Sequence, residues 1–298
     1  MTKTFKILTI LGSPHNGRSN TRALVEDFVD ELAAAGLPLE HRVISLGRTP
    51  IAPCRGCWSC AKNAPCPQSK NDDLEEVKAA MLGCDVLILA SPVYENQVSA
   101  QMKALFDRLF TWCHVFPLLG KVGLSACTTG NDGIAPTSAF LEMMLATYGV
   151  SSFGTISSMG AFTPGFFPRR DAARAGHRKL ARKVVTTLLE GKALPVTRLQ
   201  RRMFKVMKRK FAVVHAFDWI RHGPIEGQPA PPRILLWLLR RRIEKVGITD
   251  EQLDRLTKLT PFELSWWRSR GWLDARSFED LARRPRPSID AIAAVEAQ

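Results

Sequence analysis

The sequence predicts an α/β fold: a doubly wound, five-stranded parallel sheet in the order 2-1-3-4-5, followed by a basic, mainly helical extension. Short apolar runs alternate with helical patterns, which is typical of a parallel sheet covered on both faces. Small polar loops follow three of these runs. The net charge is +1 over residues 1–170 (15 Lys and Arg, 14 Asp and Glu) but +13 over 171–298 (27 and 14). We therefore expect a ligand-binding domain over 1–190 and a basic extension over 191–298.

Five segments have the apolar, β-branched composition of buried strands. They are Phe5 to Leu11, Leu39 to Leu46, Asp85 to Ala90, Lys121 to Ala126 and Ser152 to Ile156. Placing the first and third at the centre gives the order 2-1-3-4-5, the flavodoxin-like order. The loops after strands one, three and four then meet at one edge of the sheet.

Helical spacing of apolar residues predicts the segments between the strands. The first helix carries its apolar stripe from Leu24 to Leu32 and ends at Gly36. Further helices are expected at Asp72 to Met81, Val98 to Trp112, Ile134 to Tyr148 and Asp171 to Leu189. This alternation completes the doubly wound pattern.

The loop from Gly12 to Thr21 lies between the first strand and the first helix. A helix start offers N–H donors and a positive dipole end, which suits a phosphate. Hydroxyl and amide donors are present at Ser13, Ser19, Asn20 and Thr21, with Arg18 as a source of charge. The loop has neither of the common glycine-rich phosphate patterns. The simpler interpretation is that Ser19 or Asn20 only caps the helix.

Four cysteines follow the second strand in the segment PCRGCWSCAKNAPCP. Cys54, Cys57, Cys60 and Cys66 have the spacing C-x2-C-x2-C-x5-C and precede Pro67. This is the compact ferredoxin pattern with two residues added, so we predict an iron–sulfur centre. Thiols that bind nothing, a structural zinc site and a disulfide pair are the other interpretations, and zinc sites usually need a second cysteine pair.

Three stretches together resemble the flavodoxin-fold NAD(P)H-dependent FMN reductases, and more closely the iron–sulfur flavoproteins of that superfamily. They are the segments GSP…SNT, PCRGCWSC and SPVYENQVSAQMKALFDR, and the resemblance covers about residues 5–190. It implies a [4Fe-4S] cluster on the four cysteines and FMN phosphate at Ser13, Ser19, Asn20 and Thr21. It also implies an isoalloxazine ring against Pro92, Val93, Tyr94 and Asn96, with Thr129, Gly130 and Gly133 at its polar edge.

Two residues depart from the family pattern. His15 stands where the family often has Arg, so Arg18 is expected to supply that charge. Glu95 stands where an aromatic or small residue is commoner. Tyr94 also has a simpler interpretation, as a buried aromatic at the end of a strand.

By this resemblance the protein is an FMN-dependent oxidoreductase that passes electrons from NAD(P)H to a small acceptor, directly or through the cluster. No side chain is assigned as a catalytic acid or base. The alternative is an electron-transfer protein without a nicotinamide site, which docks an acidic redox partner through the extension. Relatives assemble as homodimers or homotetramers, so an oligomer is expected.

The extension begins with a basic helix from Leu199 to Ile220. Its expected apolar stripe comprises Leu199, Met203, Val206, Val213, Phe217 and Ile220. Such a helix suits an anionic membrane surface, a partner, or simple packing with a solvated basic face. Further helices are expected at 234–246, 249–259 and 261–272, and Thr249 with Gln252 forms a capping pattern. The chain shows no nucleic-acid reading motif, signal sequence or membrane-spanning run, so a cytoplasmic location is expected.

Overall fold

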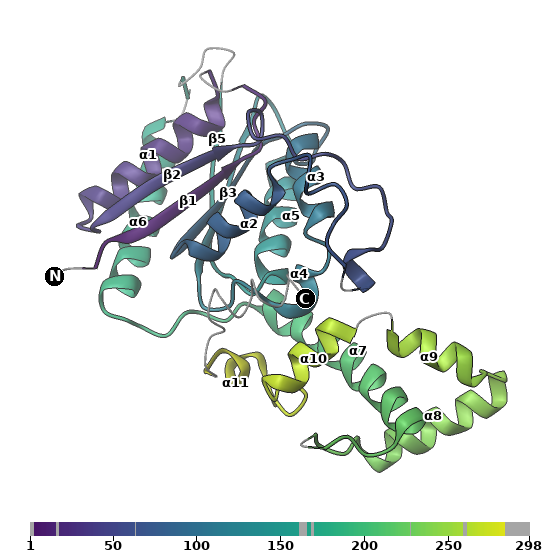
Figure 1. Ribbon diagram of the computed structural model, residues 1–298. Coiled ribbons are helices and arrows are strands. Elements are labelled where there is room, and N and C mark those ends of the chain that lie inside the picture. Colours follow the sequence, from purple (N-terminus) through teal and green to yellow (C-terminus); the bar gives the residue numbers. More distant parts are fainter. Residues whose placement is uncertain are drawn as a thin grey trace. The chain divides into compact units, whose positions relative to one another are not determined.

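Five parallel strands form one sheet in the order β2-β1-β3-β4-β5, as predicted (Figure 1). The computed structural model describes residues 3–15, 18–62, 64–160, 166–167, 170–226, 228–258 and 261–283. The strands are β1 (Phe5–Leu11), β2 (Leu39–Ser45), β3 (Val86–Pro92), β4 (Val122–Thr129) and β5 (Ser151–Met159). β5 extends three residues beyond its predicted end.

The register of the strands places their carboxyl ends along one edge of the sheet. Leu11 at the end of β1 lies opposite Ser45 of β2 and Ala90 of β3. Thr129 at the end of β4 lies opposite Met159 of β5. The loops that follow β1, β3 and β4 therefore leave the sheet on the same side, which is where parallel sheets bind ligands.

Helices of the sheet region follow the predicted alternation. They are α1 (Asn20–Ala34), α2 (Leu74–Gly83), α3 (Ala100–Arg108), α5 (Ile134–Thr147) and α6 (Arg170–Leu189). The helix predicted from Val98 to Trp112 is shorter than expected, because α3 ends at Arg108 and a separate turn, α4 (Trp112–Val115), follows. Asp72 also lies outside α2, although the sequence pattern placed it in the helix.

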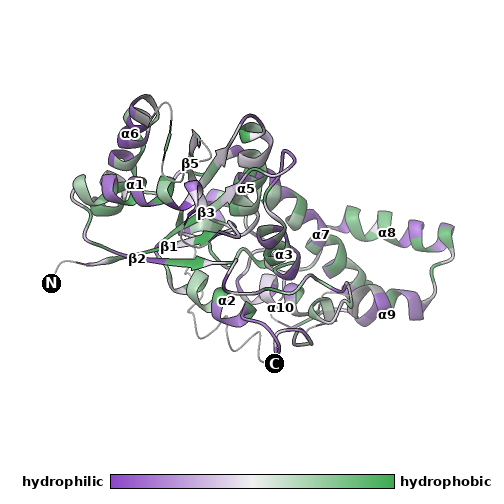
Figure 2. Cartoon of the chain, turned by 90° about the horizontal axis from the view of Figure 1, so that it is seen from above, coloured by the Kyte–Doolittle hydropathy of each residue, from purple (hydrophilic) through white to green (hydrophobic). Residues whose placement is uncertain are grey.

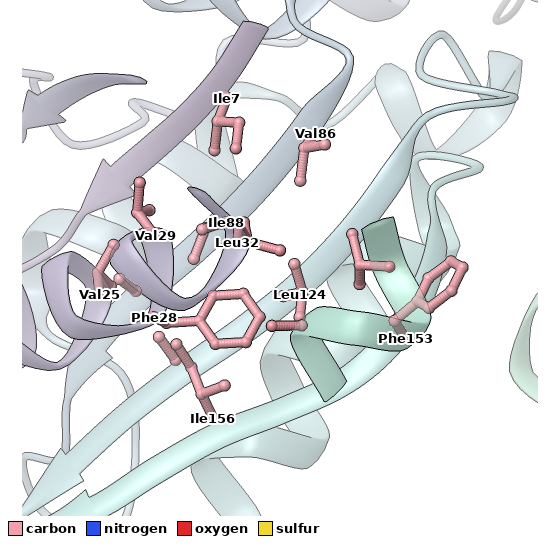
Figure 3. Packing of buried hydrophobic residues seen from close by; sticks show 14 of the residues in the cluster. Ile7, Val25, Phe28, Val29, Leu32, Val86, Ile88, Leu124, Phe153 and Ile156 are labelled. Carbon is pink, nitrogen blue, oxygen red and sulfur yellow. The ribbon is translucent and has the colours of Figure 1, made fainter. Parts of the chain in front are cut away.

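Apolar side chains of α1 pack on the sheet. Phe28 and Leu32 point toward Ile88, Leu124 and Ile156 of three strands (Figure 3), and all five are fully buried. Burying one such side chain contributes about 1.5–3 kcal/mol. The apolar stripe predicted for this helix is thus its core face.

The chain forms two compact units. The first comprises Met1–Arg55, Gln68–Phe110 and Phe116–Thr197, and the second comprises Gly56–Pro67, Thr111–Val115 and Arg198–Gln298. The domain boundary expected after residue 190 stays a prediction.

The described part of the second unit is helical. It holds η1 (Cys60–Lys62), α4, α7 (Arg198–His222), α8 (Arg233–Val246), α9 (Asp250–Lys258), α10 (Pro261–Ser269) and α11 (Phe278–Arg283). The capping pattern at the start of α9 is confirmed, since the Thr249 and Gln252 side chains each accept the other's backbone N–H, at 3.2 and 2.9 Å. Among the described helices, none combines the length and apolar character needed to cross a bilayer.

The apolar stripe predicted for α7 is not its fully buried face, because five of its six residues are only partly buried. The buried residues are Gln200, Phe204, Met207, Phe211, His215 and Ala216, whereas Val206 is 48% exposed. Two apolar stripes share this helix at helical spacing, and an aromatic partner selects one of them. The Trp267 ring of α10 stacks on Phe204 and Phe211, with ring centroids 6.0 and 5.1 Å apart.

A chain of polar groups crosses the interior of the second unit. The Lys210 ammonium donates to His114 Nε2 over 2.9 Å, and His114 Nδ1 lies 3.0 Å from Glu263 Oε1. An ammonium has no acceptor, so Nε2 accepts and the imidazole donates its Nδ1–H to the carboxylate. Burial lowers the pKa of Lys210, and the Glu263 carboxylate opposes that effect. This arrangement holds α4 between α7 and α10.

Candidate functional site

The first loop of the candidate site lies at the start of α1. Ser19 caps the helix, because its Oγ accepts the Arg22 backbone N–H at 3.2 Å. Ser13 is buried, and its Oγ accepts the His15 backbone N–H at 3.2 Å. Asn16 and Gly17 lie outside the described residues, while His15 and Arg18 are exposed. The first turn of α1 carries no acidic residue, so the described residues fit a phosphate group.

The second loop follows β3 and turns back sharply. Tyr94 and Gln97 exchange two backbone hydrogen bonds of 2.9 Å, with Glu95 and Asn96 at positive φ angles of 47° and 60° between them. The Ser91 hydroxyl accepts the Ser99 backbone N–H at 3.0 Å at the base of the loop. Because Tyr94 is 44% exposed, its interpretation as a buried strand-end aromatic is wrong. An exposed ring beside Val93 is an apolar surface on which a flat ligand can stack.

The third loop follows β4 and packs against the second. Gly133 has a φ angle of 88°, and a Cβ there would lie 2.6 Å from Val93 Cγ1 and 2.7 Å from Asn96 Oδ1. The Thr129 hydroxyl organises this loop, accepting the Asn131 backbone N–H at 3.2 Å and donating to the Asp132 carbonyl. A glycine at 133 is therefore required both by the backbone angle and by the close approach of the second loop.

Contacts between the loops bring the predicted residues together. Thr21 Oγ1 at the start of α1 lies 2.6 Å from Thr128 Oγ1 at the end of β4. The Thr128 carbonyl accepts the Val93 backbone N–H at 2.8 Å, which joins the second and third loops. A Cβ on Gly160 would lie 2.5 Å from the Asn20 amide nitrogen. Thr128 and Gly160 were not among the predicted site residues, because their partners Thr21 and Asn20 are far away in the sequence.

The four-cysteine loop is closed at its base by Gln68. The Gln68 amide donates to the Pro53 carbonyl at 2.9 Å, and its Oε1 accepts the Arg55 backbone N–H at 3.2 Å. Gln68 is buried. This clamp joins the residues on either side of the loop, and the sequence pattern did not reveal it.

A buried ion pair supports the same region. The Arg108 guanidinium donates to the Asp72 carboxylate, and the two side chains are 1% and 2% exposed. Arg108 also donates to the Ala52 carbonyl at 3.0 Å, and the Ala52 backbone N–H donates to Asp72 at 3.1 Å. Both charges are thus hydrogen-bonded to the segment that leads into the cysteine loop, as a buried pair requires.

The four cysteines of the loop differ in exposure. Cys54 and Cys57 are exposed, and Cys60 and Cys66 are partly buried. Among the described residues, no group of three or more His, Cys, Asp or Glu side chains is placed to hold a metal ion.

The other three cysteines have the properties of structural thiols. Burial raises the pKa of Cys84 and Cys113 to about 11 and that of Cys127 to about 12. Thiols with such pKa values stay protonated near neutral pH, and metals bind the thiolate. The loop cysteines are thus the better candidates for metal chemistry.

Comparison with known proteins places this chain in a family. Residues 5–163 match the family model for NADPH-dependent FMN reductase. The chain is 32% identical over 171 residues to an iron–sulfur flavoprotein of Archaeoglobus fulgidus, covering 57% of this chain and 75% of that protein. It is 39% identical over 118 residues to one of Methanocaldococcus jannaschii, covering 40% and 58%.

Among solved structures, NAD(P)H:quinone oxidoreductase from Methanothermobacter marburgensis is similar at 20% identity and a TM-score of 0.44, covering 62% of this chain and 98% of that one. The family model spans more than half of the chain, including the three loops at the carboxyl edge of the sheet. The chain therefore belongs to the NADPH-dependent FMN reductase family of flavin oxidoreductases.

Proposed function

We propose that this protein binds FMN at the three joined loops and transfers electrons from NAD(P)H to a small acceptor. The observation that carries the proposal is the junction of these loops through Thr21, Thr128 and Gly133 in a chain of the FMN reductase family. Bound FMN would supply the redox chemistry by accepting a hydride and returning electrons to an acceptor. The chain's own residues bind and orient it.

Each loop has a distinct part in this proposal. The start of α1 holds the phosphate through its backbone N–H groups, with Arg18 contributing charge. The exposed Tyr94 ring and Val93 support one face of the flavin. The loop around Thr129 and Gly133, which packs on Val93, sets the position of the polar edge. The residues described at this edge fit FMN on these grounds.

Anaerobic stopped-flow mixing tests the proposal. Protein loaded with FMN should lose its visible flavin absorption on mixing with NADPH or NADH, and the absorption should return when an acceptor is added. Bleaching by dithionite but by neither nicotinamide would instead favour the electron-transfer protein that docks a redox partner. Protein that stays colourless after incubation with FMN would overturn both functions.

The four-cysteine loop carries a separate proposal of a [4Fe-4S] cluster. The cysteine spacing and the iron–sulfur flavoproteins among the relatives support it. We expect anaerobically purified protein to contain iron and acid-labile sulfide. Cys57→Ala should then lose the broad visible absorption, whereas Cys84→Ala, which removes a buried thiol, should keep it. If the absorption spectrum shows flavin bands but the protein contains no iron, the protein is an FMN reductase whose loop cysteines bind no cluster.

A further inference from the structure

α8 of the second unit leaves apolar side chains in water. None of its fourteen residues, all of them described, is buried. Ile234, Trp237 and Leu238 in its first two turns are 63%, 50% and 52% exposed. Leu235 and Leu239 are partly buried, and α8 packs on α7. The helix thus has an apolar surface beyond the one it uses for packing.

The second half of α8 is strongly basic. The helix carries Arg233, Arg240, Arg241, Arg242 and Lys245 against the single acid Glu244, a net charge of +4 from five cations and one anion. The Arg241 guanidinium lies 4.8 Å from the centre of the Trp237 ring. A cation and the exposed aromatic ring therefore occupy the same side of the helix. In Figure 2, α8 shows both hydrophobic and hydrophilic colouring along its length.

Basic residues of α7, in the same unit, add to the positive charge near α8. α7 exposes Arg198, Arg202, Lys205 and Arg209, whereas its Arg201 pairs with Glu279 at 2.6 Å. The three acidic residues of α9 pair with arginines, since Asp250 and Asp254 lie 3.5 and 2.9 Å from Arg221 and Glu251 lies 2.7 Å from Arg255.

We infer that α8 docks the protein on an anionic lipid bilayer surface, with Ile234, Trp237 and Leu238 entering the interface and the arginines at the lipid phosphates. A protein surface that matched α8 by acidic charge alone would satisfy the arginines but would leave three large apolar side chains in water. An anionic bilayer accepts both, because basic groups bind its headgroups and exposed Trp, Leu and Ile enter its interfacial layer. This inference does not depend on the proposed flavin chemistry.

Vesicle co-sedimentation of the full-length protein tests it. We expect binding to vesicles of phosphatidylcholine with phosphatidylglycerol, and little binding to phosphatidylcholine alone. The triple variant Arg240→Gln, Arg241→Gln, Arg242→Gln should bind about 100-fold more weakly. The double variant Trp237→Ser, Leu238→Ser should lose at least about tenfold.

Matched control variants test whether the effect is specific to α8. They remove exposed cations or exposed apolar side chains elsewhere in the chain. The variant Lys70→Gln, Lys179→Gln, Arg182→Gln removes three exposed cations from the first unit, and Met143→Ser, Leu189→Ser removes two exposed apolar side chains there. Both should bind vesicles like the wild type. Quenching of tryptophan fluorescence by brominated lipid should fall in Trp237→Phe, which reports on ring insertion even if another variant folds poorly.

Several results would overturn the inference. One is equal binding to neutral and anionic vesicles, or no binding to either. Another is that the arginine variant loses vesicle binding while the double variant Trp237→Ser, Leu238→Ser keeps it. That result would mean that α8 recognises an acidic surface by charge alone. A third is an oligomer in sedimentation velocity that dissociates in the apolar variant without lipid, which would assign the face to a second copy of this chain.

Discussion

Arg108→Met is expected to lower the free energy of unfolding by about 3–5 kcal/mol, because it leaves the buried carboxylate of Asp72 without its partner charge. The methionine side chain fills part of the volume but offers no donor to Asp72 or to the Ala52 carbonyl. The segment entering the cysteine loop should loosen as well. Urea denaturation followed by circular dichroism measures the first effect, and hydrogen exchange of residues near Ala52 measures the second.

An exposed arginine pair in the same unit is the matched control. Arg42 and Glu76 form an ion pair at 2.6 Å, but their side chains are 54% and 61% exposed. Arg42→Met should cost about 0–1 kcal/mol. The double variant Arg108→Met, Asp72→Leu should regain part of the loss, since it removes both buried charges. Equal losses for Arg42→Met and Arg108→Met would contradict the role given to burial.

Gly133→Ala is expected to cost about 2–4 kcal/mol of stability and to weaken FMN binding at least about tenfold. An alanine at a φ angle of 88° is strained, and its Cβ would lie 2.6 Å from Val93 Cγ1 and 3.1 Å from Asn96 Cα. Relief of that contact moves the loop that carries Val93 and Tyr94. Thermal unfolding measures the stability loss, and fluorescence titration with FMN measures the affinity.

Gly130 in the same loop provides the control. A Cβ there would meet no atom of the described residues within 4 Å, and the φ angle of Gly130 is not in the left-handed region. Gly130→Ala should therefore retain wild-type stability within about 0.5 kcal/mol. If both variants bound FMN like the wild type, the third loop would have no part in holding the flavin.

The sheet and its ligand edge were predictable because parallel strands have strong local signatures. Local sequence patterns were enough to predict β1 and β3 from their apolar runs. The same holds for the end of α1, where Gly36 has a φ angle of 91°. Once the strand order was predicted, the positions of the loops after β1, β3 and β4 followed from the geometry of parallel strands. The binding roles of the individual residues stay predictions.

The supporting contacts were not predictable, because they join residues far apart in the chain. Arg108 and Asp72 are 36 positions apart and Thr21 and Thr128 are 107 apart. The sequence pattern placed Asp72 at a helix N-terminus, where acidic residues commonly interact with the helix dipole. Only the folded chain shows that it is buried against a guanidinium.

Local periodicity in the sequence determined the α/β pattern. Together with the flavodoxin-like topology of doubly wound sheets, it predicted the strand order and the edge at which the loops meet. The tertiary structure decided which face of α7 is buried, because helical spacing does not show that Phe204 and Phe211 stack on Trp267. It also decided the partners of the buried charges. A buried ion pair forms between two groups that folding brings together and removes from water. The sequence pattern does not show which distant groups these are.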